Sequence, residues 1–168
     1  MTSHDPTHDT RLLSAWRSVI RAYQTCAHQY EKLMQQFGLT TAQFDVLAAI
    51  NAVDGRCKPS DLANRLLVSK GNISGLLKRL RAQQLIHIAA DASDGRAYWC
   101  ELTPKARQLY QQAQQASLAF VREQLSPFSA AQHDQVEQIM RQMTRHLQTM
   151  DPASIAQPFI NKALTHET

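Results

Sequence analysis

Residues 57–103 read CKPSDLANRLLVSKGNISGLLKRLRAQQLIHIAADASDGRAYWCELT. A short helix is predicted over 59–66, because a proline fits the first turn of a helix and two leucines follow at helical spacing. A second helix, 70–84, carries Lys and Arg opposite its leucines. Two strand-like runs, 85–89 and 97–102, then flank a turn-rich segment. This order of elements is typical of a winged helix-turn-helix with a two-strand wing, and it predicts binding to duplex DNA.

The composition predicts one folded unit that spans residues 1–168. Of the 168 residues, 43% are hydrophobic, which is enough to bury one sizeable core. The basic residues are unevenly placed: residues 56–105 hold nine Lys and Arg against four Asp and Glu, whereas the rest of the chain has a net charge of −1. A local positive excess is expected of a nucleic-acid contact surface, and an ordinary solvated face is the alternative interpretation.

Long amphipathic helices are predicted on both sides of that stretch. Apolar residues recur at three- and four-residue steps over 12–34, which predicts a helix that begins at Asp9 or Thr10 and ends at Gly38. The apolar stripe of this helix is wide enough to need a partner. Further helix starts are marked by Thr40 with Gln43, Thr103 before Pro104, and Ser129 with Gln132. The tail after Met150 is left unassigned.

The face of the 70–84 helix opposite its leucines carries the candidate DNA contacts. In a helix-turn-helix this helix lies in the major groove, and its N-terminal turns meet base edges. Lys70, Ser74 and Lys78 are spaced four residues apart on that face. Ser69 is the expected N-cap, and the Asn72 amide suits a bidentate contact with adenine.

Two glycines interleave with these side chains. A glycine lowers the stability of a helix by about 1 kcal/mol relative to alanine. Gly71 and Gly75 therefore suggest that the backbone of this helix comes close to another group on its polar face. Lys78, Arg79 and Arg81 lie one to three turns further on and suit phosphates better than bases. Ordinary solvated helix residues are the alternative interpretation of the whole face.

The predicted hairpin tip offers a second contact. Arg96 is placed to enter the minor groove, where negative potential favours a guanidinium, and Asp94 is placed to orient it through an ion pair. A surface salt bridge that only shapes the turn is the alternative.

The chain resembles the MarR family of bacterial transcription regulators over residues 10–148. The specific motifs are LTTAQFDVL at 39–47, LANRL at 62–66, SKGNISGL at 69–76 and DGR at 94–96 before Leu102-Thr103. Gly95 departs from the family, in which many members have a basic residue there. The resemblance implies a mainly α fold: a winged lobe at 39–103, dimerisation helices at 10–38 and 104–150, and a tail at 151–168.

The same resemblance implies a homodimer that represses transcription from an inverted-repeat operator and is released by a small-molecule or oxidant effector. Trp16, Tyr23, Tyr30 and Met34 are candidates for lining the effector pocket. Dimer core is the alternative role for this stripe of aromatic and apolar residues.

Three cysteines, without a CxxC spacing, predict neither a disulfide framework nor a zinc site. Cys26 is a candidate oxidant sensor, as in the peroxide-responsive branch of the family, whereas Cys57 and Cys100 are expected to be packed or incidental. His28 and Glu31 are also ligand types, but neighbours two positions apart do not share a helix face. We therefore expect no metal site and no cofactor.

The remaining expectations concern location and protein class. No apolar run approaches the roughly 18 residues of a membrane span, so we expect a cytoplasmic protein without a membrane partner. No Gly-rich phosphate loop, GxSxG or HExxH motif occurs, so an enzyme is not expected. The alternative to a DNA-binding regulator is a helical interaction module that uses a winged lobe to bind an acidic protein.

Overall fold

The computed structural model describes residues 6–90 and 98–164, and it divides the chain into two compact units, 1–121 and 122–168. The described elements, in chain order, are α1 (Pro6–Gln35), α2 (Thr41–Asn51), β1 (Arg56–Cys57), α3 (Pro59–Leu66), α4 (Lys70–Ala82), β2 (Ile86–Ala90), β3 (Tyr98–Leu102), α5 (Pro104–Leu125), α6 (Ala130–Thr149) and α7 (Pro152–Leu164). The predicted mainly helical fold with a winged helix-turn-helix is confirmed. Whether the two units make one domain stays a prediction.

The predicted two-strand wing is confirmed as the β2–β3 pair, and a third strand of the sheet, β1, was not predicted. β3 lies in the middle and pairs antiparallel with β1 on one side and β2 on the other. β1 is only two residues long, too short for an alternation of apolar and polar residues to reveal it. Its pairing places Arg56 opposite Glu101 and Cys57 opposite Cys100.

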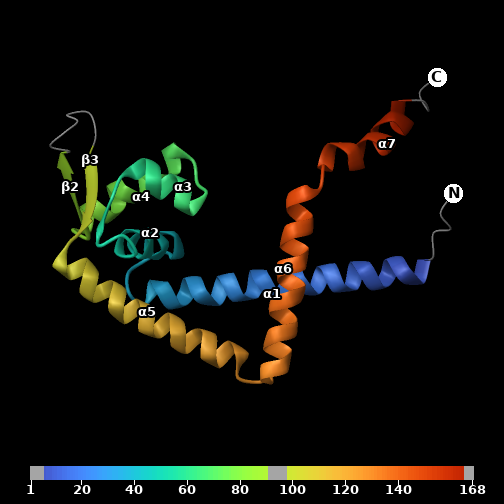
Figure 1. The fold of residues 1–168 in the computed structure, drawn as a ribbon, viewed down its shortest axis with the longest axis horizontal. Coiled ribbons are helices and arrows are strands. Elements are labelled where there is room, and N and C mark those ends of the chain that lie inside the picture. Colours follow the sequence, from blue (N-terminus) through green and yellow to red (C-terminus); the bar gives the residue numbers. More distant parts are fainter. Residues whose placement is uncertain (1–5, 91–97, 165–168) are drawn as a thin grey trace. The chain divides into compact units, whose positions relative to one another are not determined.

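The core of the winged lobe lies between α2, α3, α4 and one face of the sheet. Figure 1 shows these three helices grouped beside the β2–β3 hairpin. Leu47, Ile50, Leu62 and Leu80 are all 0% exposed. Burial of the leucine side of α4 is confirmed, and this burial leaves its polar side facing out.

The chain turns sharply between α1 and α2. Gly38 has φ +68°, the left-handed conformation that lets a helix stop, and the Leu39 N–H donates to the Met34 carbonyl at 3.2 Å. The predicted stop at Gly38 is therefore confirmed. The predicted start was wrong: α1 begins at Pro6, a residue that suits a first turn because the missing N–H has no partner there in any case.

Capping residues start the later helices as predicted. The Thr40 and Gln43 pair closes a capping box, with bonds of 3.2 and 2.9 Å, and Ser129 does the same with Gln132. Thr103 Oγ1 accepts the Ala106 N–H at 3.1 Å at the start of α5. These contacts fix where each helix begins.

The end of α4 differs from the prediction, and the unassigned tail contains a further helix. α4 stops at Ala82, not at Gln84, because Gln84 has φ +59° and lies outside the helical region. The unassigned tail contains α7, whose first turn is capped by Asp151: its carboxylate accepts the Ala153 N–H at 3.0 Å.

Large apolar side chains remain exposed on α1, α6 and α7. On α6 no residue is buried, and Leu147 is 58% exposed. On α1, Trp16 is 59% exposed and Tyr23 71%. The other exposed apolar residues are Leu12, Leu13 and Ile20 on α1, Val136 and Ile139 on α6, and Ile155, Phe159 and Ile160 on α7.

Candidate nucleic-acid interface

Lys70 and Ser74 share one exposed side of α4, and Asn72 is exposed on another part of the helix surface. The Ser69 hydroxyl accepts the Asn72 N–H at 3.3 Å, so the predicted N-cap is confirmed. The side chains of Lys70, Asn72 and Ser74 are exposed, and the Ser74 hydroxyl donates to the Lys70 carbonyl at 2.9 Å. An ammonium, an amide and a hydroxyl exposed on the first turns of the helix can donate to and accept from base edges.

The two glycines of α4 leave open space beside this side. A Cβ on Gly71 would meet only the Ser69 hydroxyl, at 4.0 Å, and a Cβ on Gly75 would meet only the Arg79 guanidinium, at 3.8 Å. Packing within the chain therefore requires neither glycine. The backbone here is accessible to an outside molecule, which fits the close approach that the sequence suggested.

The remaining predicted contacts lie elsewhere. Lys78, Arg79 and Arg81 are exposed, and Arg79 belongs to the C-terminal end of α4, where it lines a hollow with Gln35 and Gly38. The structure thus separates Arg79 from the N-terminal end of the helix, where base contacts were predicted. Asp94 and Arg96 fall outside the described residues, so the wing-tip contact stays a prediction.

A hollow of about 300 Å³ opens beside the N-terminal end of α4. Its lining comes from the start of α3, the first turns of α4 and the strand β3, and consists of Lys58, Pro59, Ser60, Lys70, Ile73, Ser74 and Tyr98. None of these residues is acidic. Lys58, Ser60 and Tyr98 were not predicted to lie close together, because their proximity depends on the pairing of β1 with β3, which was not predicted.

Two cations stack on a tryptophan at the same edge of the sheet. The Arg56 guanidinium carbon lies 4.4 Å from the centre of the Trp99 ring, and Lys58 Nζ lies 4.9 Å from it. Arg56 also pairs with Glu101, with 3.2 Å between Nε and Oε1. Because side chains alternate along a strand, Trp99 and Glu101 share the face opposite the buried Cys100.

An aromatic cleft of about 520 Å³ lies between α2 and α5. It is lined by Phe44, Ala48, Tyr110, Gln114, Gln115, Ser117, Leu118 and Val121. The Phe44 and Tyr110 rings stack with centroids 5.6 Å apart. The Tyr30 hydroxyl hydrogen-bonds to the Ser117 hydroxyl at 2.7 Å, so α1 also contributes to the wall of this region.

The four predicted pocket residues are not gathered at one place. Tyr30 borders the α2–α5 cleft through Ser117, whereas Met34 is 0% exposed in the core. Trp16 and Tyr23 are well exposed on α1. Their ligand role stays a prediction. Gln114 and Gln115 on α5 were not predicted to line a cleft, because a polar residue on an amphipathic helix is usually exposed to solvent.

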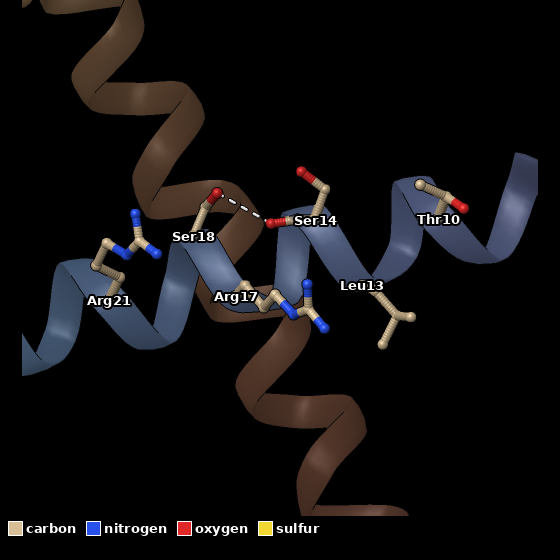
Figure 2. Close-up of a pocket in the computed structure, with 6 residues that line it drawn as sticks. All are labelled: Thr10, Leu13, Ser14, Arg17, Ser18 and Arg21. Atoms are coloured by element: carbon tan, nitrogen blue, oxygen red, sulfur yellow. Dashed lines mark hydrogen bonds between the residues drawn. The ribbon is translucent and has the colours of Figure 1, made fainter.

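Figure 2 shows a further hollow, of about 550 Å³, along the N-terminal half of α1. It is lined by Thr10, Leu13, Ser14, Arg17, Ser18 and Arg21. The Ser18 hydroxyl donates to the Ser14 carbonyl at 3.0 Å. The charged groups of the lining are the guanidiniums of Arg17 and Arg21. None of the predicted ligand or DNA residues belongs to it.

The cysteines differ in accessibility. Cys57 and Cys100 are buried free thiols, as predicted, and Cys26 is partly buried on α1. Burial, followed by the charge of Cys57, raises the pKa of Cys100 from 9.0 to about 11, and burial raises the pKa of Cys57 as well. Since the thiolate is the reactive form, both buried thiols are poor redox centres.

Residues 6–90 and 98–164 contain neither a cluster of metal ligands nor a membrane-spanning helix. No three His, Cys, Asp or Glu side chains there come together as a metal ligand set would. No helix in the same ranges has the length and apolarity needed to cross a bilayer.

Known proteins resemble this chain over most of its length. Residues 37–97 match the model of the MarR family. The transcriptional activatory protein BadR of Rhodopseudomonas palustris is 30% identical over 132 residues, which cover 74% of this chain and 75% of BadR. The residues that match the family model include all of α4.

Solved structures share the fold. A mutant of MarR from E. coli complexed with operator DNA matches with a TM-score of 0.70 and 19% identity, covering 83% of this chain and 99% of that one. The organohalide sensing transcriptional regulator RdhR in its 2,4-dichlorophenol bound form matches with a TM-score of 0.73 and 16% identity, covering 87% and 88%. At these identities the likeness establishes the fold.

Proposed function

The chain belongs to the MarR family of DNA-binding transcription regulators, and we propose that it is a ligand-responsive repressor that binds an inverted-repeat operator as a homodimer. The observation that carries the proposal is the exposed side of α4. There the side chains of Lys70, Asn72 and Ser74 are exposed on the first turns of a helix whose two glycines leave its backbone open, and Ser69 fixes the start of the helix.

The arrangement suits a helix that lies in the major groove. The Asn72 amide can pair with adenine, which presents an acceptor and a donor side by side in the major groove. Lys78, one to two turns further along, is exposed and suits a backbone phosphate. Base contacts then supply sequence preference, and phosphate contacts supply most of the salt-dependent affinity.

A homodimer accounts for the exposed apolar residues of the long helices. Leu147 on α6 and Trp16 on α1 are both more than half exposed, although residues of this kind are usually covered. A second copy of the chain would cover them. Two-fold symmetry then places two α4 helices on half-sites about 10 to 11 base pairs apart, which is an inverted repeat.

The effector in this proposal is a small aromatic compound held in the α2–α5 cleft. The cleft volume of about 520 Å³ lies in the usual range for ligand pockets, about 300–1,000 Å³. The stacked Phe44 and Tyr110 rings offer an aromatic wall, and Gln114 and Ser117 offer polar partners. RdhR, a structure of the same fold, is a 2,4-dichlorophenol bound form, which supports this ligand class.

The DNA-binding part is tested by fluorescence anisotropy. The purified protein first selects duplexes from a random pool, and the selected duplex is then compared with a scrambled one at about 50 and 200 mM salt. We expect selective binding that weakens with salt by about 0.9 logarithmic units per phosphate contacted for each tenfold rise in salt. Binding without any selectivity would contradict the proposal and favour the protein-interaction module.

The effector part is tested with 2,4-dichlorophenol as the probe. Leu118 is 51% exposed and lines the cleft, so Leu118→Trp should fill the cleft without disturbing the core. The probe should release the wild-type protein from its duplex and leave the variant bound. Gln112→Trp, on the same helix but outside the lining, is the matched control. Release of all three proteins alike would refute the cleft as the effector site.

Activation of transcription is the second candidate, because BadR, the relative at 30% identity, is named as an activatory protein. In vitro transcription from a promoter that contains the selected duplex separates the two. A repressor lowers transcript yield when it binds, whereas an activator raises it.

A further inference from the structure

We propose that Gln43 and Gln83 are positioning residues that set where α4 lies relative to α1, and that they thereby determine how the first turns of α4 meet the bases of the operator. The proposal rests on the DNA-binding function above. Gln83 is the C-cap residue of α4, at the opposite end of the helix from Lys70. The proposal therefore gives a role in DNA recognition to residues far from the predicted base contacts.

Two side-chain amides join the end of α4 to the turn between α1 and α2. The Thr40 N–H donates to Gln43 Oε1 at 2.9 Å, and Gln43 Nε2 donates to Gln83 Oε1 at 3.0 Å. Gln83 Nε2 then donates to the Gly38 carbonyl at 3.4 Å. The backbone groups at the two ends fix the orientation of both amides, because an N–H only donates and a carbonyl only accepts. The hydrogen bonds and the chain from 38 to 40 close a ring.

Gln43 is held firmly enough to act as the anchor of this ring. Its side chain is 4% exposed, and its own N–H donates to the Thr40 hydroxyl at 3.2 Å in the capping box of α2. The turn is tied to α1 as well, because Glu31 accepts the Thr41 N–H at 2.8 Å. The position of α1 is therefore transmitted to Gln43 through hydrogen bonds.

The ring supplies a directional contact that the core of α4 lacks. The helix buries Ile73, Leu76, Leu77 and Leu80. Apolar packing of this kind is not directional, whereas a hydrogen bond depends on both distance and angle. On the other side, Lys105 Nζ from α5 donates to the Gln83 carbonyl at 3.2 Å. The end of α4 is thus held between the α1–α2 turn and the start of α5.

A hollow of about 470 Å³ beside the ring makes the proposal testable without unfolding the protein. Gln43 and Gln83 both line it, together with Arg79. Water that enters the hollow can replace a lost partner of the Gln43 amide. Removal of the Gln83 amide should therefore loosen the end of α4 and leave the core intact.

The first test is the ratio of affinities for the selected and the scrambled duplex, measured by anisotropy. Gln83→Met removes the amide from a side chain of similar length, and this ratio should fall about two- to tenfold, the range expected for one hydrogen bond. Affinity for the scrambled duplex should not change, because phosphate contacts carry no sequence information. Gln84→Met makes the same change at the neighbouring exposed residue, outside the ring, and should keep the wild-type ratio. A wild-type ratio for Gln83→Met would overturn the proposal.

A conservative variant tests the bond to Gln43. Gln83→Glu keeps an oxygen that accepts from Gln43 Nε2, so it should retain most of the wild-type ratio. Its added negative charge weakens both duplexes alike and leaves the ratio unaffected. A fall in the ratio as large as that of Gln83→Met would contradict positioning through Gln43.

The second test varies the distance between the half-sites. In the proposed homodimer α1 belongs to the dimer interface, so the ring also sets the separation of the two α4 helices. One base pair inserted between the half-sites should weaken wild-type binding, and it should weaken Gln83→Met less because its α4 is held less firmly. A merely structural role would lower thermal stability and leave the penalty for the insertion at its wild-type value, which would refute positioning.

Failure of the proposal is distinguishable from failure of the proposed function. If the wild-type protein selects no duplex, the function fails. If it selects a duplex and Gln83→Met shows the wild-type ratio and the wild-type penalty for the insertion, only the positioning role fails. Thermal melting of each variant checks that the fold is retained.

Discussion

The winged lobe and the helices α1 and α6 use their apolar residues in opposite ways. In the lobe, side chains such as Leu62 and Leu80 are fully buried within one chain. On α6 no residue is buried, and Leu147 and Ile139 are each more than half exposed. The difference indicates that the lobe is stabilised by its own sequence, and in the proposed homodimer a second copy of the chain covers the apolar residues of α1 and α6. Substitutions in the lobe should therefore change the stability of one chain, and substitutions on α1 and α6 should change the association of two chains.

The largest effect is expected at Leu147, because a carboxylate in a covered apolar interface would lose its hydration without gaining a partner. Leu147→Glu should convert dimers into monomers or aggregates in analytical ultracentrifugation and abolish tight operator binding. Gln148→Glu adds the same charge at the next, exposed residue and should leave the dimer intact. A Leu147→Glu protein that remains a soluble dimer would contradict the assignment of α6 to the dimer interface.

The core of the lobe should respond next most strongly. Leu80 is 0% exposed, so Leu80→Ala should lower the free energy of unfolding by about 2–5 kcal/mol. Urea denaturation at several protein concentrations measures this loss. The neighbouring exposed residue gives the control, since Arg81→Ala should stay within about 0.5 kcal/mol of wild type. A similarly small loss at Leu80 would mean that the lobe lacks the core described.

The exposed side of the lobe should affect DNA and not stability. Asn72→Ala should cost about 1–3 kcal/mol on the selected duplex and relax sequence preference, whereas Lys78→Ala should weaken all duplexes evenly. Anisotropy with selected and scrambled duplexes separates the two patterns. Equal losses on both duplexes for Asn72→Ala would remove its base-reading role.

The smallest effect concerns the junction between α1 and the lobe. Glu31 accepts the Thr41 N–H at 2.8 Å, and this backbone hydrogen bond is the main reason why the pKa of Glu31 lies below its ordinary value. A carboxyl with a lower pKa in the folded state stabilises the fold above its unfolded pKa. That contribution is lost as the pH falls through the folded pKa.

Glu31→Gln should therefore destabilise the protein near neutral pH by less than about 1 kcal/mol, because solvent screens this contact. The difference from wild type should shrink between about pH 5 and pH 3. Urea denaturation at a series of pH values measures it. A difference that is constant across this range would show that the carboxylate is not responsible.

Sequence reasoning succeeded where the signal is local. Capping at Thr40, Ser69 and Ser129 depends on residues three positions apart, and the turn at Gly38 depends on one residue. The mainly helical fold and the buried side of α4 follow from the same short-range periodicity. Local signals did not reveal α7, although Asp151 caps its first turn and Pro152 opens it.

Long-range features were out of reach. Residues 56 and 57 form a strand only because β3 lies beside them, and that pairing brings Lys58 toward Trp99 and Tyr98. The hollow beside α4 therefore has no signature in the sequence. The stripe of α1 was ambiguous for another reason: Met34 belongs to the core and Trp16 is exposed, although both follow the same period.

The most direct test of the account varies the spacing between half-sites. If α1 and α6 join two winged lobes, a duplex with half-sites about 10 to 11 base pairs apart should bind far more tightly than a single half-site. Inserting about 5 base pairs puts the half-sites on opposite faces of the duplex and should reduce affinity to the single-site level. Wild-type affinity that is indifferent to spacing would contradict the account.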